Sequence, residues 1–133
     1  MITPYSQAIR FTDCDIFGHI NNAIYLTFFE EARIYYFNLL LGDEWNWETN
    51  GFIIRTNEVE YLFPIFHKDT IQIEIILSNL GQTSFELFYT IKNKNTNNIV
   101  TKGKSLIMYY NHLTKEKKVL DKLLSNALLK LKK

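Results

Sequence analysis

The chain has 133 residues, enough for one hydrophobic core, and 47% of them are apolar, so a packed globular domain is expected. The net charge of +1 gives no reason to expect nucleic acid or an anionic membrane as a partner. Cys14 is the only cysteine, which excludes an intrachain disulfide and fits a reducing compartment. Because no signal peptide and no bilayer-spanning apolar run is visible, we expect one cytoplasmic domain over residues 1–133.

The first third of the chain predicts a strand, a loop and a helix. Residues 5–12 have extended character, and residues 13–21 carry Asp, Gly and Asn without an apolar period, as a loop does. Nothing interrupts a helix over residues 22–41, and Gly42 provides a stop. Asn21 or Asn22 suits the N-cap, since its side-chain oxygen can accept an orphan N–H of the first turn.

This helix is expected to be apolar on almost all sides. Its polar residues form a narrow stripe, with Arg33 to one side of it: Thr27, Glu30, Glu31 and Asn38. Such a helix in a soluble protein must be covered on most sides. In so short a chain the available cover is a curved sheet, with a second subunit as a further source.

Four strands and a closing helix follow. The strands are expected at residues 52–62, 70–77, 84–92 and 99–110; the second shows a period of two, with isoleucines alternating with polar residues. Short links between the later strands require antiparallel pairing. The tail, about residues 113–133, spaces leucines helically among lysines. A strand, a buried helix and then four strands predict an α+β fold.

Candidate chemistry is concentrated immediately before the predicted helix. Asp13 and Asp15 stand there with a glycine, a histidine and two asparagines. A helix N-terminus offers unpaired N–H groups and partial positive charge, so it can hold a carboxylate and stabilise an oxyanion. The alternative is an N-capping loop in which these residues serve only turn geometry. Residue types and spacing alone do not name a reaction.

The same stretch resembles the 4-hydroxybenzoyl-CoA thioesterase-like branch of the hotdog superfamily. That branch shows D-[TC]-D-x-x-G-H-x-N-N-x-x-Y followed by E-x-A-R. The matching residues here, in the same register, are Asp13-Cys14-Asp15, Gly18-His19, Asn21-Asn22, Tyr25 and Glu30-Glu31-Ala32-Arg33. Tyr61 to Pro64 and Asp69 resemble a second family motif, and the resemblance extends to about Tyr110. It implies a hotdog fold, in which a five-stranded antiparallel sheet wraps a long central helix.

The resemblance implies an acyl-CoA thioesterase, which hydrolyses a thioester to a carboxylic acid and CoA. Asp15 falls on the family's catalytic carboxylate, acting as nucleophile or general base, and either role requires its ionised form. Asn22 falls on the residue whose backbone N–H polarises the thioester carbonyl. His19 matches the motif histidine, which orients water or holds the loop; we favour the loop.

Three further motif positions are implied to contact or border the substrate. Gly18 lets the loop approach the substrate without a Cβ, Asn21 matches a motif asparagine, and Tyr25 packs at the acyl pocket. Asp13 is expected to be structural, bonding backbone N–H groups of the turn. Cys14 is expected to be a packed thiol and not a nucleophile.

The implied partners are an acyl-CoA or an acyl-carrier-protein thioester and a second copy of the chain. Family members join two sheets through their second strands, so we expect a homodimer, or a tetramer or hexamer built from dimers. No cofactor is expected, and no metal, because the three histidines lack zinc-ligand spacing. Lys92, Lys102 and Lys104 either contact the CoA phosphates or simply keep a strand face solvated.

Two other functions remain open at this point. A hotdog dehydratase or hydratase would use a histidine with a helix glutamate, which Gly18-His19 with Glu30 or Glu31 imitates. The proline-rich continuation of that motif is absent, however, as is the D-x-N-P-x-H motif of the other hydratase branch. A non-catalytic acyl-binding protein is the third possibility, and retention of Asp15 argues against it.

Overall fold

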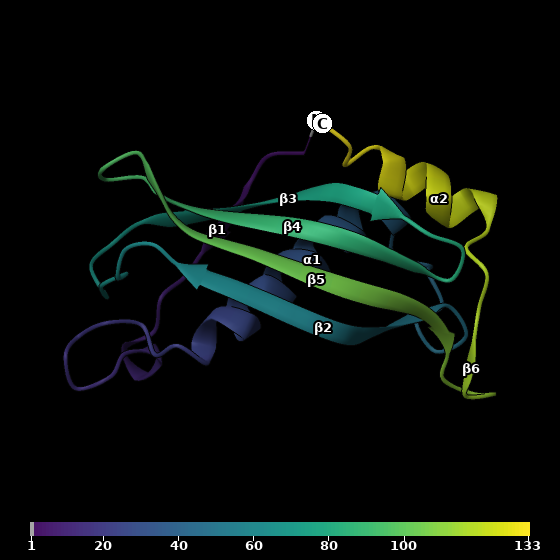
Figure 1. Ribbon diagram of the computed structural model, residues 1–133, viewed down its shortest axis with the longest axis horizontal. Coiled ribbons are helices and arrows are strands. Elements are labelled where there is room, and N and C mark those ends of the chain that lie inside the picture. Colours follow the sequence, from purple (N-terminus) through teal and green to yellow (C-terminus); the bar gives the residue numbers. More distant parts are fainter. Residues whose placement is uncertain (1) are drawn as a thin grey trace.

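A computed structural model describes residues 2–133 and places a long helix on one face of a curved, six-stranded antiparallel sheet (Figure 1). The elements in chain order are β1 (Tyr5–Gln7), a 3-10 turn (Phe11–Asp13), α1 (Ile24–Leu41), β2 (Gly51–Tyr61), β3 (Ile71–Leu80), β4 (Ser84–Asn93), β5 (Asn98–Asn111), β6 (Glu116–Lys117) and α2 (Lys122–Leu129). Their order in the sheet is β1-β3-β4-β5-β2, with β6 paired to β5. The predicted α+β arrangement is confirmed.

The structure departs from several of the sequence-based boundaries. The first strand ends at Gln7, because residues 11–13 turn into a 3-10 helix. The helix starts at Ile24, two residues later than expected. The predicted helical tail of about residues 113–133 is helical only over Lys122–Leu129. The residues before this helix include a sixth strand, β6, which pairs Lys117 with Tyr110 and is too short to show any period in the sequence. No helix within residues 2–133 combines the length and the hydropathy needed to cross a membrane.

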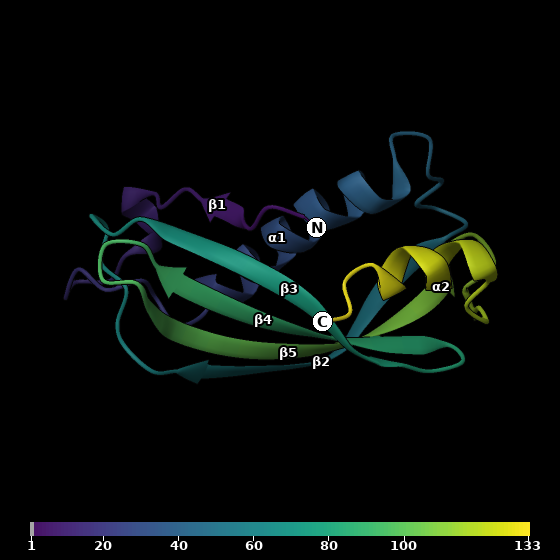
Figure 2. The same cartoon turned by 90° about the horizontal axis from the view of Figure 1, so that it is seen from above.

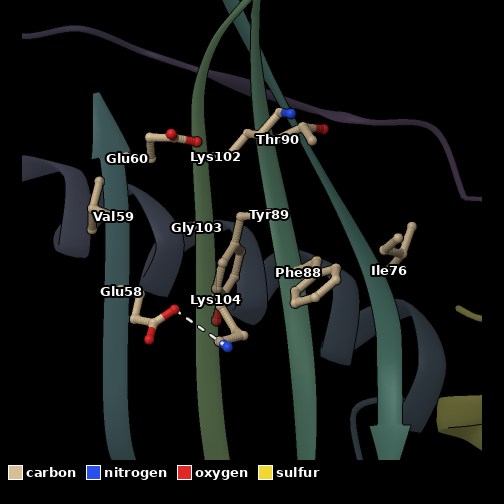
Figure 3. Close-up of a pocket in the computed structure, with 10 residues that line it drawn as sticks. All are labelled: Glu58, Val59, Glu60, Ile76, Phe88, Tyr89, Thr90, Lys102, Gly103 and Lys104. Atoms are coloured by element: carbon tan, nitrogen blue, oxygen red, sulfur yellow. Dashed lines mark ion pairs between the residues drawn. The ribbon is translucent and has the colours of Figure 1, made fainter. Parts of the chain in front are cut away.

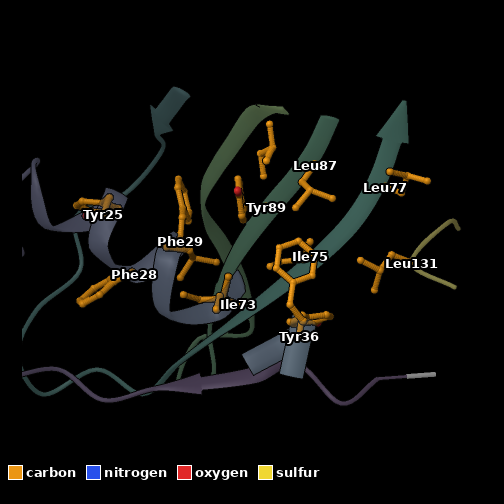
Figure 4. Close-up of a cluster of buried hydrophobic side chains, with 14 of the residues drawn as sticks. Tyr25, Phe28, Phe29, Tyr36, Ile73, Ile75, Leu77, Leu87, Tyr89 and Leu131 are labelled. Carbon is orange, nitrogen blue, oxygen red and sulfur yellow. The ribbon is translucent and has the colours of Figure 1, made fainter. Parts of the chain in front are cut away.

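The core lies between α1 and the inner face of the sheet. The alternating residues of β3 that the sequence predicted to share a face are buried, and their side chains point toward the helix (Figure 4). The helix contributes a buried face of mostly aromatic residues, namely Tyr25, Phe28, Phe29, Ala32, Tyr36 and Phe37. Each fully buried large side chain contributes about 1.5–3 kcal/mol, so this face determines which side of α1 meets the sheet.

The closing helix α2 covers the far end of the same core. Asp121 caps it, its Oδ1 accepting the Leu124 N–H at 2.9 Å. Leu124, Leu128 and Leu131 are buried, and the Leu77 N–H donates to the Leu131 carbonyl at 3.0 Å. Both helices lie on the same side of the sheet (Figure 2). Among residues 2–133, no helix covers the opposite face of the sheet.

Gly103 on β5 sets how closely α1 can approach the sheet. The Phe29 ring stacks on Tyr89 with centroids 4.2 Å apart and planes 9° apart. A Cβ at residue 103 would lie 2.5 Å from that ring and 3.2 Å from the Glu58 carbonyl oxygen. Beside the stack, Arg33 Nη1 donates to the Tyr89 hydroxyl at 2.9 Å. Glycine is required here for space and not for backbone conformation.

We expect Gly103→Ala to lower the free energy of unfolding by about 1–3 kcal/mol, because the added methyl group displaces the Phe29 ring from a packed core. Denaturant unfolding followed by circular dichroism measures this change. Lys102→Ala, on the exposed side of the same strand, is the matched control and should shift the midpoint very little. Equal midpoints for the Gly103→Ala variant and the wild type would refute the packing argument.

Candidate functional site

The residues before α1 form a small hairpin over residues 13–21. Its strands meet at a bridge between Cys14 and Ile20, and the Asn21 N–H donates to the Asp13 carbonyl at 2.8 Å. At the tip, the Asp15 N–H donates to His19 O at 2.8 Å and the Gly18 N–H donates to Asp15 O at 3.0 Å. This is a three-residue hairpin loop closed by a glycine in the left-handed region, with φ of +80° at Gly18. Gly18 therefore serves the turn itself.

The Asp15 carboxylate uses one oxygen to hold this turn. Its Oδ1 accepts the Phe17 N–H at 2.9 Å and the His19 N–H at 3.2 Å. Within residues 2–133 its Oδ2 accepts no hydrogen bond, and the residue is exposed. The arrangement leaves one oxygen of a fixed carboxylate free to act on a substrate or on water.

Asp13 anchors the hairpin to the rest of the fold. Its carboxylate is buried, with 3% of the residue exposed, and Oδ2 accepts the Arg10 N–H at 2.9 Å. The Arg10 side chain bonds the same carboxylate at 3.3 Å and reaches Glu31 of α1 at 3.5 Å. Gln7 also donates to Glu31, at 3.1 Å. The structural role predicted for Asp13 agrees with this geometry.

The hairpin leads directly into the N-terminus of α1. Asn21 Oδ1 accepts the Ala23 N–H at 3.0 Å, and its carbonyl accepts the Ile24 N–H at 2.9 Å. Within residues 2–133 the Asn22 N–H has no hydrogen-bond partner, while its carbonyl accepts the Tyr61 hydroxyl at 3.0 Å. The N-cap of α1 is Ala23, which has no side-chain cap, so the prediction of Asn21 or Asn22 as the N-cap was wrong; Asn21 instead shapes the turn before the cap. The sequence also missed Tyr61, whose contact with this turn comes from the end of β2.

A hollow of about 540 Å³ opens beside the hairpin. Its lining comprises Phe11, Cys14, Asp15, Ile16, Gly18 and His67. Burial, and then the nearby Asp13 and Asp15 carboxylates, raise the pKa of the Cys14 thiol, which keeps it in the less reactive neutral form. Asp15 and Gly18 are thus brought together as expected. His67 was considered in the sequence only as a metal ligand, and nothing in its local pattern marks it as part of this site.

Four other predicted site residues do not line this hollow, namely His19, Asn21, Asn22 and Tyr25. The His19 ring packs edge-on against Phe66, with centroids 4.8 Å apart, and its backbone forms a bridge with the same residue. This placement agrees with a loop-holding role. Tyr25 is 2% exposed and meets Tyr61 edge-on at 4.8 Å. Burial raises the pKa of the Tyr25 hydroxyl to about 12, and the side chain acts by packing beneath the helix start.

A larger hollow, of about 780 Å³, lies on the uncovered face of the sheet (Figure 3). Its lining includes Phe88, Thr90, Lys102 and Lys104 and shares no residue with the hollow beside Asp15. Lys104 is paired with Glu58 at 3.3 Å and with Glu86 at 3.8 Å. The carboxylate that the sequence predicts to be catalytic, Asp15, lines only the smaller hollow. Nowhere in residues 2–133 do three His, Cys, Asp or Glu side chains gather as a metal site would require.

Asp13→Asn should lower the free energy of unfolding by about 1–3 kcal/mol, because its amide is a weaker acceptor and buries an N–H group beside the Arg10 donors. The Arg10 side chain is 56% exposed, so we assign most of the effect to the backbone hydrogen bond and not to the ion pair. Thermal and denaturant unfolding measure the change. The same substitution at exposed Asp43 is the control; equal shifts for both variants would contradict the anchoring role.

The chain was compared with known proteins by sequence and by fold. A sequence model described as the thioesterase-like superfamily matches residues 9–128. YsmA, an uncharacterized protein of Bacillus subtilis strain 168, is 31% identical over 86 residues, which are 65% of this chain and 58% of YsmA. The match thus spans less than two thirds of that relative's length.

Solved structures extend the likeness to the whole fold. A thioesterase from Thermus thermophilus, complexed with coenzyme A and Zn, is 26% identical with a TM-score of 0.82, over 95% of this chain and 90% of that one. The PA5185 protein of Pseudomonas aeruginosa PAO1 is 19% identical with a TM-score of 0.88, over 98% and 92% of the two chains. The predicted hotdog fold is confirmed. With nine tenths of its length matched by the family's sequence model, the chain belongs to the thioesterase-like superfamily.

Proposed function

We propose that this protein hydrolyses an acyl-CoA thioester to a carboxylic acid and CoA, with Asp15 as the catalytic carboxylate. The observation that carries the proposal is the free oxygen of Asp15, held in a hollow by a hairpin that leads into a helix N-terminus. The Thermus thioesterase, which was solved with coenzyme A, supports the choice of carrier. We keep the acyl-carrier-protein thioester as the alternative carrier.

The chemistry follows from what each group can donate or accept. Asp15 either attacks the thioester carbon directly or takes a proton from the water that does so. The negative charge that develops on the carbonyl oxygen is received by the unpaired Asn22 N–H at the start of α1, where the helix dipole adds to the stabilisation. The C–S bond then breaks and CoA leaves through its sulfur. Asn21 and Gly18 keep this turn in shape, and Tyr25 supports it from below.

A dehydratase is the weaker alternative, because it would need a histidine facing the substrate from the Gly-His motif. The His19 ring instead packs against Phe66 and does not line the hollow. A non-catalytic acyl-binding protein is the third candidate, and it would not require the free oxygen of Asp15. Thiol release from a panel of acyl-CoA substrates, set against absorbance changes with enoyl-CoA, discriminates the three functions.

Asp15→Asn should reduce kcat for the best acyl-CoA by about a hundredfold or more, because it removes the charge that either mechanism requires. The Asn side chain keeps an Oδ1 acceptor for Phe17 and His19, so the turn and the unfolding free energy should be retained. Thiol release measures turnover, and unfolding measures stability. Wild-type turnover in this variant would rule Asp15 out as the catalytic group.

We further propose that the active unit is a homodimer joined through β2, with tetramers or hexamers as multiples of it. β2 is an 11-residue edge strand without proline, so its outer N–H and C=O groups are free to pair. Antiparallel pairing about the middle of two copies places Gly51 of one beside Tyr61 of the other. Since Tyr61 contacts Asn22, the second copy would border the oxyanion site.

Light scattering at micromolar concentration should therefore give at least twice the 15.8 kDa mass of one chain. On dilution, specific activity should fall together with the mass, because the partner helps to enclose each site. Activity and mass are measured over the same dilution series. A monomer with full activity would exclude both the β2 interface and the shared site.

A further inference from the structure

The hollow beside Asp15 contains an imidazole that does not come from the Gly-His motif. Of its six lining residues, three can carry or transfer a proton: Cys14, Asp15 and His67. Cys14 is held as a neutral thiol, and Asp15 is assigned to attack on the carbonyl. That leaves the imidazole of His67 without a role in the proposed reaction.

The loop that carries His67 is tied to the catalytic hairpin by backbone contacts. The Ile20 N–H donates to the Ile65 carbonyl at 2.8 Å, and His19 and Phe66 form an antiparallel bridge. His67 is the next residue along the chain. Its position relative to Asp15 is therefore set by a short ladder of main-chain pairs and not by a free loop.

Two further contacts fix the loop and the ring. Asp69 closes a turn, accepting the Phe66 N–H on Oδ2 at 2.8 Å while its own N–H donates to Phe66 O at 3.0 Å. The His67 ring meets Phe11 edge-on, with centroids 6.0 Å apart and planes at 80°. Phe11 lines the same hollow, so the contact keeps the imidazole at its wall. The Asp69 carboxylate is occupied by the backbone, and Lys68 does not line the hollow.

At neutral pH the departing CoA sulfur ends as a thiol, because the pKa of an alkyl thiol lies above 7, so an acid beside the sulfur can assist cleavage of the C–S bond. Imidazole is the side chain that ordinarily gains and loses a proton near neutral pH. A general acid beside a developing negative charge commonly contributes a factor of about 10²–10⁴ to a rate. The hollow thus has in its lining both a group that can act as an acid on the leaving group and a carboxylate for the attack.

We propose that His67 is the catalytic acid that protonates the leaving thiolate, a role that rests on the proposed thioesterase function. As the C–S bond breaks, its electron pair goes to sulfur and the imidazolium N–H transfers a proton to it. The neutral imidazole recovers a proton from solvent, which receives the proton that Asp15 takes from the attacking water. The net reaction consumes one water and yields a carboxylate, a proton and a thiol.

The test compares two leaving groups on one acyl chain. N-acetylcysteamine thioesters release a basic alkyl thiolate, whereas 4-nitrothiophenol thioesters release a thiolate stable enough to leave without a proton. His67→Gln should lower kcat for the first on the order of a hundredfold and leave kcat for the second unchanged. Free imidazole added to His67→Ala should restore turnover of the alkyl thioester. Lys68→Gln, on the same loop, is the matched control and should affect neither substrate.

The outcomes separate the two proposals. Equal losses on both substrates would assign His67 a positioning or structural role, and no loss on either would remove it from the reaction; each result overturns the acid assignment. If either of these results is obtained for His67 while Asp15→Asn loses activity on both substrates, the acid assignment falls and the proposed function stands. If the wild-type protein hydrolyses neither class of thioester nor acyl-CoA, both proposals fall together.

Discussion

The contact of Phe29 with Gly103 is the constraint from which the position of the candidate site follows. With no side chain at residue 103, the Phe29 ring stacks flat on Tyr89 and brings α1 close to β5. Because a helix moves as a rigid rod, the distance between α1 and β5 at Phe29 also fixes the position of the helix N-terminus, which lies little more than one turn earlier. Tyr61 can then reach the Asn22 carbonyl from the end of β2. The proposed oxyanion position at Asn22 thus depends on packing at Phe29 and Gly103.

The hairpin before α1 is held by a different kind of force. Its tip buries almost nothing, since Ile16 is 94% exposed, and it is shaped by hydrogen bonds from Asp15 and by the left-handed Gly18. Asp13, by contrast, uses its buried carboxylate to accept the Arg10 N–H. The two aspartates of the motif therefore have different roles. Asp13 joins the hairpin to the rest of the fold, and Asp15 keeps one oxygen free at the surface.

The sequence predicts most of the fold because its elements carry strong local signals. The period of two in β3, the uninterrupted apolar helix and Gly42 after it all lie within single segments. The predicted first strand was too long, since the Asp13 carboxylate bonds Arg10 N–H and favours a 3-10 turn there. Within the site, Asp15 and Gly18 share one motif, whereas His67 comes from another segment. The position of His67 beside this motif depends on the His19–Phe66 bridge, a contact between distant segments that no local sequence pattern predicts.

The hollow around Asp15 is open in the single chain, and this openness bears on how the site works. A carboxylate in contact with water is stabilised mainly by solvent, so the field of the helix N-terminus has little effect on it. Once a substrate or a second chain covers the apolar residues Phe11, Ile16 and Phe17, water is displaced and the same charges interact more strongly. These exposed apolar side chains lie near Asp15, the carboxylate proposed to act on a thioester. When these side chains are covered, they exclude water from the proposed site.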